Sequence, residues 1–144
     1  MDFTNEMKIE FDSKSINESF ARTVVASFVA QLDPTIEEIN DVKTAVSEAV
    51  TNAIIHGYNN QDGKVIISCK IKDREVFIEV KDRGVGIEDI GKAMEPLYTT
   101  RPEIERSGMG FSFMEAFMDK LIVESELGKG TTVKMSKKFE KRGD

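Results

Sequence analysis

The chain is poor in cysteine and in long apolar runs. Of its 144 residues only Cys69 carries a thiol, which excludes an intrachain disulfide and a metal site built from several cysteines. Because it lies in an apolar run, we interpret Cys69 as a small buried side chain. No stretch reaches the roughly 18 apolar residues of a membrane-spanning helix, and the first residues lack the regions of a signal peptide. These absences predict a soluble, cytoplasmic protein.

An excess of positive charge is also missing. The 20 basic and 26 acidic residues give a formal net charge of −6. Proteins that hold nucleic acid nonspecifically rely on a basic surface, so this balance argues against direct nucleic-acid binding. The length suits one domain with its own core, and neither a repeat nor a linker divides the chain. We therefore expect a single domain over residues 1–144.

The most informative feature that is present is a polar stripe in an apolar helical pattern. Thr44, Glu48, Asn52 and His56 recur every fourth residue, so they share one face of a helix. Most apolar residues of the same segment fall on another face. Glu48 and Asn52, one turn apart, can therefore address one ligand together. We interpret His56, which ends the helix, as structural rather than as one of the ligand-facing residues.

Periodicity divides the rest of the chain into strands and helices. Ser15 to Glu18 has capping-box spacing, and it opens an amphipathic helix. Asp33 is the predicted N-cap of the next helix, and Gly57 is the residue predicted to end it. The apolar stripe of the first helix consists of Ile16, Phe20, Val24, Phe28 and Leu32. Strands are predicted at 7–11, 65–71, 76–82, 121–126 and 131–139, with a hairpin turn at 72–75 and a further buried helix at 111–121.

Two of these strands place a polar side chain on an apolar face. Asp82 ends the inward row of the strand 76–82, and Thr131 shares its face with Val133 and Met135. A buried carboxylate without a donor is costly, so we expect Asp82 to meet a polar ligand group at the mouth of a pocket. The alternative is that the strand has already ended and Asp82 is a turn residue. If the two strands pair, Thr131 lies beside the pocket row.

Glycine motifs border a long segment with little periodicity. They are a Gly-Val-Gly at 84–86 and a Gly-Met-Gly at 108–110, and the segment 87–107 between them is typical of a binding lid. The second motif opens a helix, where backbone N–H groups can approach an anion. Arg101 and Arg106 in the lid could neutralise phosphate charge.

Together these parts suit a nucleotide pocket. The amide oxygen of Asn52 suits Mg²⁺, Glu48 could accept a proton, and Asp82 could accept from the exocyclic amine of adenine. Other nucleotide motifs fail on inspection. The spacing from Gly57 to Gly63 is one residue too long for a Walker loop, a dinucleotide fingerprint lacks its third glycine, and the motif pair of protein kinases is absent.

Four motifs in this order resemble the boxes of the GHKL ATPase superfamily, which includes gyrase, Hsp90, histidine kinases and MutL. They are Glu48-x-x-x-Asn52, Asp82-x-Gly84-x-Gly86, Gly108-Met109-Gly110-Phe111 and Gly130-Thr131. Segments 17–22, 47–58 and 105–111 further resemble the sporulation anti-sigma factors of endospore-forming bacteria, which are serine kinases of that superfamily. The resemblance implies an α+β fold: a two-layer sandwich of a mixed, mostly antiparallel sheet with helices on one face.

By matching positions, the resemblance also implies roles for single residues. Glu48 would be the catalytic base, Asn52 the Mg²⁺ ligand, Asp82 the adenine contact and Thr131 its support. Arg22 matches a position on the partner-facing first helix. The remaining ATP contacts would be Gly84, Gly86, Thr99, Thr100, Arg101, Arg106, Ser107, Gly108, Met109 and Gly110. Where the family usually has lysine after the paired threonines, this chain has Arg101.

The resemblance further implies a function with named partners. The protein would be a protein serine/threonine kinase dependent on ATP and Mg²⁺. It would hold a sigma factor of the sigma-F type as a homodimer, and phosphorylate a serine of an anti-anti-sigma factor. Three alternatives stay open: a general-stress sigma factor as partner, a nucleotide-gated binding module without phosphotransfer, and a detached histidine-kinase ATPase domain.

Overall fold

The computed structural model describes residues 4–93 and 110–140. Its strands are β1 (Asn5–Asp12), β2 (Lys64–Lys72), β3 (Glu75–Asp82), β4 (Lys120–Glu126) and β5 (Gly130–Lys138). Its α-helices are α1 (Ile16–Val29), α2 (Ile36–Asn52), α3 (Ile90–Ala93) and α4 (Phe111–Phe117). A 3₁₀ turn at Ala30–Leu32 follows α1, and a π turn at Ala53–Gly57 follows α2.

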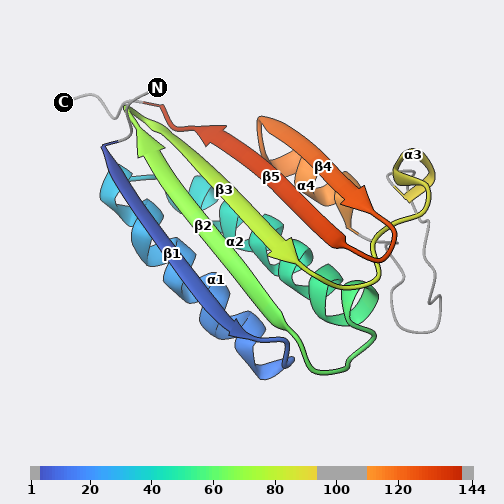
Figure 1. Ribbon diagram of the computed structural model, residues 1–144. Coiled ribbons are helices and arrows are strands. Elements are labelled where there is room, and N and C mark those ends of the chain that lie inside the picture. The colour runs from blue at the N-terminus through green and yellow to red at the C-terminus, as the bar shows by residue number, and fades with distance from the viewer. Residues whose placement is uncertain (1–3, 94–109, 141–144) are drawn as a thin grey trace.

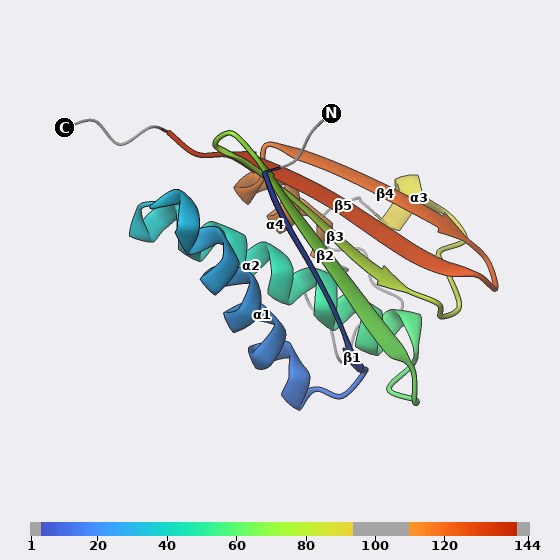
Figure 2. The same cartoon turned by 60° about the vertical axis from the view of Figure 1, so that its left-hand side comes forward.

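These elements form the predicted two-layer α+β sandwich (Figure 1). The sheet order is β1-β2-β3-β5-β4, and every pairing among the described residues is antiparallel, whereas a mixed sheet is predicted. Seen from the side in Figure 2, α1, α2 and α4 cover one face of the sheet and leave the other face open. Within the described residues, no helix is long and apolar enough to cross a membrane.

Alternation along the strands decides which face of the sheet is buried. In β3 the inward residues are Val76, Ile78 and Val80, and they are almost fully buried. They pack with the inward rows of β2 and β5 and with the apolar side of α2 into one core. Asp82 follows in the same row and is 6 % exposed, so the carboxylate ends an apolar row inside the sandwich.

The buried side of α1 differs from the prediction. Its buried residues are Ala21, Val25, Phe28 and Val29, whereas Ile16 and Phe20 are 80 % and 53 % exposed. A row of residues spaced by four drifts about 40° per step around a helix, so the predicted stripe cannot stay against the sheet along its whole length. Phe20 instead contacts the edge strand, where its ring lies edge-to-face with Phe11 at a centroid distance of 6.5 Å.

Helix capping also differs from the prediction. Ser15 precedes α1 without a side-chain cap hydrogen bond. The capping box instead opens α2, where Thr35 Oγ1 accepts from the backbone N–H of Glu38 and the Glu38 carboxylate accepts from that of Thr35. Asp33, the predicted N-cap, has a φ of 50° and ends the preceding 3₁₀ turn. A left-handed residue cannot supply the extended geometry that an N-cap needs.

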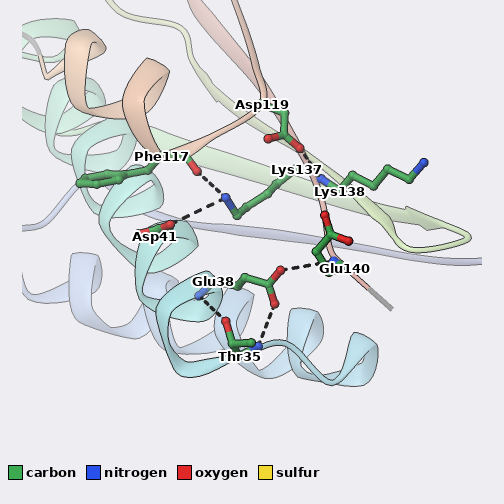
Figure 3. Close-up of polar contacts among 8 residues, drawn as sticks. All are labelled: Thr35, Glu38, Asp41, Phe117, Asp119, Lys137, Lys138 and Glu140. Carbon is green, nitrogen blue, oxygen red and sulfur yellow. Dashed lines mark hydrogen bonds and ion pairs between the residues drawn. The ribbon is translucent and has the colours of Figure 1, made fainter. Parts of the chain in front are cut away.

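Helix α4 is shorter than predicted. It ends at Phe117, because Met118 is extended and the Asp119 N–H donates to Ser136 O at the start of sheet pairing. Leu121, predicted in the helix as well as at the start of the next strand, lies in β4. The end of α4 is held from β5, where Lys137 Nζ donates to Phe117 O at 2.8 Å (Figure 3).

The two ends of the described chain lie beside the β2–β3 hairpin. The predicted turn is confirmed, with Lys72 opposite Glu75 and a two-residue connection between them. Asn5 at the start of β1 stands opposite Ile71, and Lys138 at the end of β5 stands opposite Glu75. Both ends are therefore at the opposite end of β3 from Asp82, as Figure 1 shows.

Candidate functional site

Four predicted site residues line one cavity, namely Gly86 and three polar residues. Asn52 of α2, Asp82 of β3 and Thr131 of β5 are buried and border it together. Asp82 and Thr131 stand opposite each other in the β3–β5 pairing, as their shared face predicts. The cavity has a volume of about 20 Å³, the space of one water molecule. Most of the predicted lid, residues 87–107, lies outside the described residues.

The Asp82 carboxylate is an acceptor held in a mainly apolar wall. Its Oδ1 accepts from the backbone N–H of Gly84 at 2.9 Å, and the carboxylate also accepts from the backbone N–H of Thr131. These bonds lower its pKa, but burial outweighs them and raises the pKa from 3.8 to about 6. At neutral pH Asp82 is therefore ionised and can accept a hydrogen bond from a ligand N–H group.

Three glycines let the chain close tightly around Asp82. A Cβ on Gly57 would lie 2.9 Å from Asp82 Cγ, and one on Gly84 would lie 2.0 Å from Gly57 O. A Cβ on Gly130 would lie 2.1 Å from Asp82 O. Gly57 is therefore required by this contact and is not the left-handed residue predicted to end the helix. Left-handed backbone occurs later, at 59–60.

A π turn places His56 at the cavity. It begins directly after Asn52, and the Tyr58 N–H donates to Ala53 O at 2.9 Å. Such turns are rare and frequently occur at functional sites. His56 is 7 % exposed and lines the cavity together with Asn52. His56 thus lies beside Asn52 at the cavity, and its interpretation as a structural residue stays a prediction.

Glu48 lies at the edge of the site where α4 begins. Along α2 the residues of the polar stripe become more buried: Thr44 is exposed, Glu48 is half-buried and Asn52 is buried. A Cβ on Gly110, which has a φ of 70°, would lie 2.2 Å from Glu48 Oε2. Gly110 thus leaves room for the carboxylate. The structure thereby brings Glu48 to the last glycine of the second glycine motif.

The other predicted residues fall into three groups. Gly84 and Gly86 lie in the loop after β3, and Gly86 lines the cavity. Arg22 lies on α1, away from the residues that line the cavity. Outside the described residues lie Thr99, Thr100, Arg101, Arg106, Ser107, Gly108 and Met109.

Sequence reasoning missed two hydroxyl groups near the site. Tyr58 Oη donates to Lys64 O at 2.6 Å and accepts from the backbone N–H of Arg83 at 2.7 Å, which fixes the residue after Asp82. No pattern in the sequence marks this role. Ser125 of β4 is detectable, because like Asp82 it is a polar residue near the end of an inward row.

Comparison with known proteins defines the class to which the chain belongs. A family model described as a histidine kinase-like ATPase domain matches residues 11–137, so the chain belongs to this ATP-using family. Solved structures share the fold. The RsbU and RsbW domains of a Mycobacterium tuberculosis protein match with a TM-score of 0.67 at 22 % identity, over 94 % of this chain and 32 % of that one. The catalytic domain of histidine kinase ThkA matches with a TM-score of 0.58 at 17 % identity, over 96 % of this chain and 97 % of that one.

Curated relatives narrow the class to one family. The anti-sigma F factor of Clostridium acetobutylicum is 67 % identical over 135 residues, which cover 94 % of each chain. That of Clostridium botulinum (strain Eklund 17B / Type B) is 67 % identical over 138 residues, covering 95 % of this chain and 96 % of the relative. That of Thermoanaerobacter sp. (strain X514) is 65 % identical over 137 residues, covering 95 % and 96 %. The chain belongs to the family of anti-sigma F factors.

Proposed function

We propose that the protein sequesters a sigma factor of the sigma-F type in the cytoplasm and inactivates an anti-anti-sigma partner by phosphorylating one of its serines. The observation that supports this most is the convergence of Asn52, Asp82 and Thr131 on one cavity, with Glu48 next to Gly110, the residue that precedes the cavity-lining Phe111. High identity to proteins named anti-sigma F factor favours sigma F over a general-stress sigma factor as partner.

The described residues fit an adenine nucleotide with magnesium. Gly57, Gly84 and Gly130 let the chain close around Asp82, whose carboxylate lines the cavity. The ionised carboxylate of Asp82 suits the exocyclic amine of adenine, whereas guanine carries a carbonyl oxygen at the corresponding position. The amide oxygen of Asn52 suits Mg²⁺, which takes oxygen ligands and shares its shell with phosphates and waters. When bound, the nucleotide supplies the γ-phosphoryl group.

Glu48 is the residue that distinguishes a kinase from a binding module. It is half-buried one turn before Asn52, so its carboxylate lies at the edge of the site rather than in bulk solvent. We propose that it accepts the proton of the substrate serine hydroxyl as that oxygen attacks phosphorus. Binding of a nucleotide alone requires no such base. General-base catalysis of this kind contributes about 10²–10⁴ in rate.

Helix α1 is the surface proposed to hold the sigma factor. It exposes two large apolar side chains, Ile16 and Phe20, a composition that suits a protein partner. Arg22 Nε lies 3.6 Å from Glu18 Oε2, and the same oxygen accepts from Ser47 Oγ at 2.6 Å. Glu18 therefore connects the proposed partner contact to the residue that precedes the catalytic base.

The proposal extends to a homodimer formed through the open face of the sheet. This face carries a hollow of about 310 Å³ with Phe77 and the 56 % exposed Ile122 among its lining residues. Lys70 and Lys134 lie at the same hollow, and each pairs with a glutamate across strands. Mixed charges around an apolar centre suit a two-fold interface in which one surface faces its own copy.

Labelled ATP and an anti-anti-sigma protein test the kinase proposal directly. We expect label on a serine of the partner, stable to acid, whereas a histidine kinase activity would give an acid-labile product. Glu48→Ala should lower the rate of transfer by at least about a hundredfold and leave ATP bound, because it removes the base alone. Asp82→Asn should instead weaken ATP binding, because it puts an amide donor opposite the adenine amine.

The matched control is Glu37→Ala, which removes an exposed carboxylate from the first turn of the same helix. It should leave both transfer and binding unchanged. Wild-type protein that binds ATP but never labels the partner would establish the nucleotide-gated module instead. Equal loss of ATP binding in the Glu48 and Asp82 variants would contradict this division of roles. A pull-down against a panel of sigma factors tests the partner.

A further inference from the structure

The hydroxyl group of Ser125 contacts three residues beside Asp82, where the base of the proposed nucleotide would bind. Ser125 Oγ accepts from the backbone N–H of Ile87 at 2.7 Å, in the loop that follows the first glycine motif. It donates to Gly130 O at 3.0 Å and contacts Thr131 Oγ1 at 2.8 Å. Three partners are the full capacity of a hydroxyl group, which has one donor and two acceptor positions. Ser125 is therefore fully used within the protein.

The position of Ser125 in the fold explains these contacts. It stands directly opposite Thr131 in the β4–β5 pairing, and its side chain is on the inward face of β4. Neither Ser125 nor Gly130 lines the cavity, whereas Ile87 and Thr131 do. Ser125 thus lies behind the cavity wall and holds two of the residues that form it.

The Thr131 hydroxyl depends on Ser125 for its orientation. Thr131 is 8 % exposed, and among the described residues Ser125 is the one side chain that forms a hydrogen bond with Thr131 Oγ1. The Asp82 carboxylate accepts from the backbone N–H of Thr131, whereas the Thr131 hydroxyl forms its hydrogen bond with Ser125. Without Ser125, the Thr131 hydroxyl would lose the partner that fixes the direction of its O–H bond, although the branched side chain keeps Oγ1 in place. The hydroxyl would then no longer offer one fixed hydrogen-bonding direction to a base bound beside Asp82.

We infer that Ser125, which also holds the Ile87 backbone, is a positioning residue that sets the selectivity for adenine by fixing the Thr131 hydroxyl at the cavity wall. The inference rests on the proposed function, since it concerns the base of the nucleotide bound at that site. Binding of a nucleotide has two contributions, one from the base and one from the phosphates, and the inference concerns only the first. Ser125 is expected to act on recognition of the base and to leave contacts with the phosphates unchanged.

The test compares affinity for ATP and for ITP, which carries an oxygen where adenine carries the amine. We expect wild-type protein to prefer ATP, and Ser125→Ala to lower the ATP-to-ITP affinity ratio about fivefold, which is the effect of one typical hydrogen bond. The ratio is the informative quantity, because a general loss of structure weakens both ligands alike. Ser125→Cys fills the same space with a weak hydrogen-bonding group, so it gives the same test if the alanine variant does not fold.

Ser136→Ala is the matched control. Ser136 lies on β5, is 4 % exposed, and its Oγ has no hydrogen-bond partner among the described residues. The same change there should leave the ATP-to-ITP ratio at the wild-type value. Thr131→Val provides the second control, since Ser125→Ala should lower the ratio no further when the Thr131 hydroxyl is already missing.

The outcomes distinguish this inference from the proposed function. If Ser125→Ala and Ser125→Cys fold but keep the wild-type ratio, Ser125 is structural only and the inference fails. It also fails if Ser125→Ala lowers the ratio equally in the Thr131→Val background, because the effect would not pass through Thr131. If wild-type protein binds neither nucleotide, the proposed function itself fails.

Discussion

Asp82 is placed where its charge costs folding energy. Its pKa is raised to about 6 because the carboxyl is buried, although two backbone N–H groups partly compensate. A protein selected only for stability would have an apolar or amide side chain here. Retaining an ionised acid in this wall is understandable if a ligand N–H group completes its hydrogen bonding.

The raised pKa gives a pH-dependent stability. Well below pH 3.8 the carboxyl is protonated in both states. Between about pH 3.8 and 6 the unfolded chain ionises while the folded carboxyl still largely holds its proton, so the folded state loses stability in this window. The cost approaches about 3 kcal/mol and is constant at higher pH. We expect the stability of Asp82→Asn relative to wild type to increase by about 2 kcal/mol between pH 4 and 6.5, which is most of the full cost.

Urea unfolding of the two proteins at matched pH values measures this difference. Other groups titrate alike in both proteins, so their contributions cancel in the comparison. A difference that stays constant across the window would show that Asp82 has an ordinary pKa in the folded protein. The same variant is expected to lose ATP binding, so greater stability and loss of function would occur together.

At the scale of elements, Lys137 connects three parts of the fold. Figure 3 shows its ammonium group between the end of α4 and the side of α2, opposite Phe117 O at 2.8 Å and Asp41 Oδ2 at 3.7 Å. The Lys137 side chain is only 13 % exposed. Nearby, the Glu38 carboxylate that caps α2 also accepts from the backbone N–H of Glu140 at 3.3 Å. These contacts join β5 to both helices.

We expect Lys137→Met to destabilise the protein by about 2 kcal/mol. The substitution keeps the apolar stem but leaves a helix-end carbonyl and a half-buried carboxylate without their charged partner. Lys138→Met is the control, since Lys138 is exposed and its contact with Asp119 is made by the backbone N–H. It should change stability by less than about 0.5 kcal/mol. Equal unfolding midpoints in urea for the two variants would contradict the assignment.

The sequence predicts those elements whose periodicity and burial agree. Strand alternation identifies the inward row that ends at Asp82 and the face that Thr131 shares, and the observed pairing of the two strands brings the two residues together. Pairing at Asp119 ends α4 early, and the left-handed backbone of Asp33 moves the cap of α2 to Thr35. The first is decided by a contact with a distant segment, which a local pattern does not contain, and the second by the backbone conformation of Asp33.

In the site, too, local patterns identify some residues and miss those whose roles depend on distant contacts. Glu48 and Asn52 are identified by helical spacing, because both lie on one element. Tyr58 acts through backbone groups of β2 and of the loop after β3, and Gly57 is required by the Asp82 carboxylate, which is 25 positions later in the numbering. Roles of this kind depend on how the chain crosses itself, so they become visible only in the folded structure.

At the scale of the whole molecule, the open face of the sheet carries the prediction of a dimer. Ile122→Glu places a charge at the hollow, and in a two-fold interface the two new carboxylates would be buried near each other. We expect the dissociation constant of the dimer to rise by about a hundredfold or more, because like charges at an interface cost several kcal/mol. Analytical ultracentrifugation in the presence of ADP and Mg²⁺ measures it.

Leu127→Glu is the matched control for the dimer. Leu127 is 59 % exposed in the β4–β5 turn and does not line the hollow, so the same change there should leave the dissociation constant unaltered. A wild-type protein that is monomeric at every concentration, or equal weakening by both variants, would show that this face is not the interface.

The position of the two strand ends has a practical consequence. Because Asn5 and Lys138 both stand beside the β2–β3 hairpin, a tether or fluorescent reporter attached at either of them would extend away from Asp82. The molecule could be immobilised on a sensor, or its ends joined and new ones opened elsewhere, without obstructing entry to the cavity.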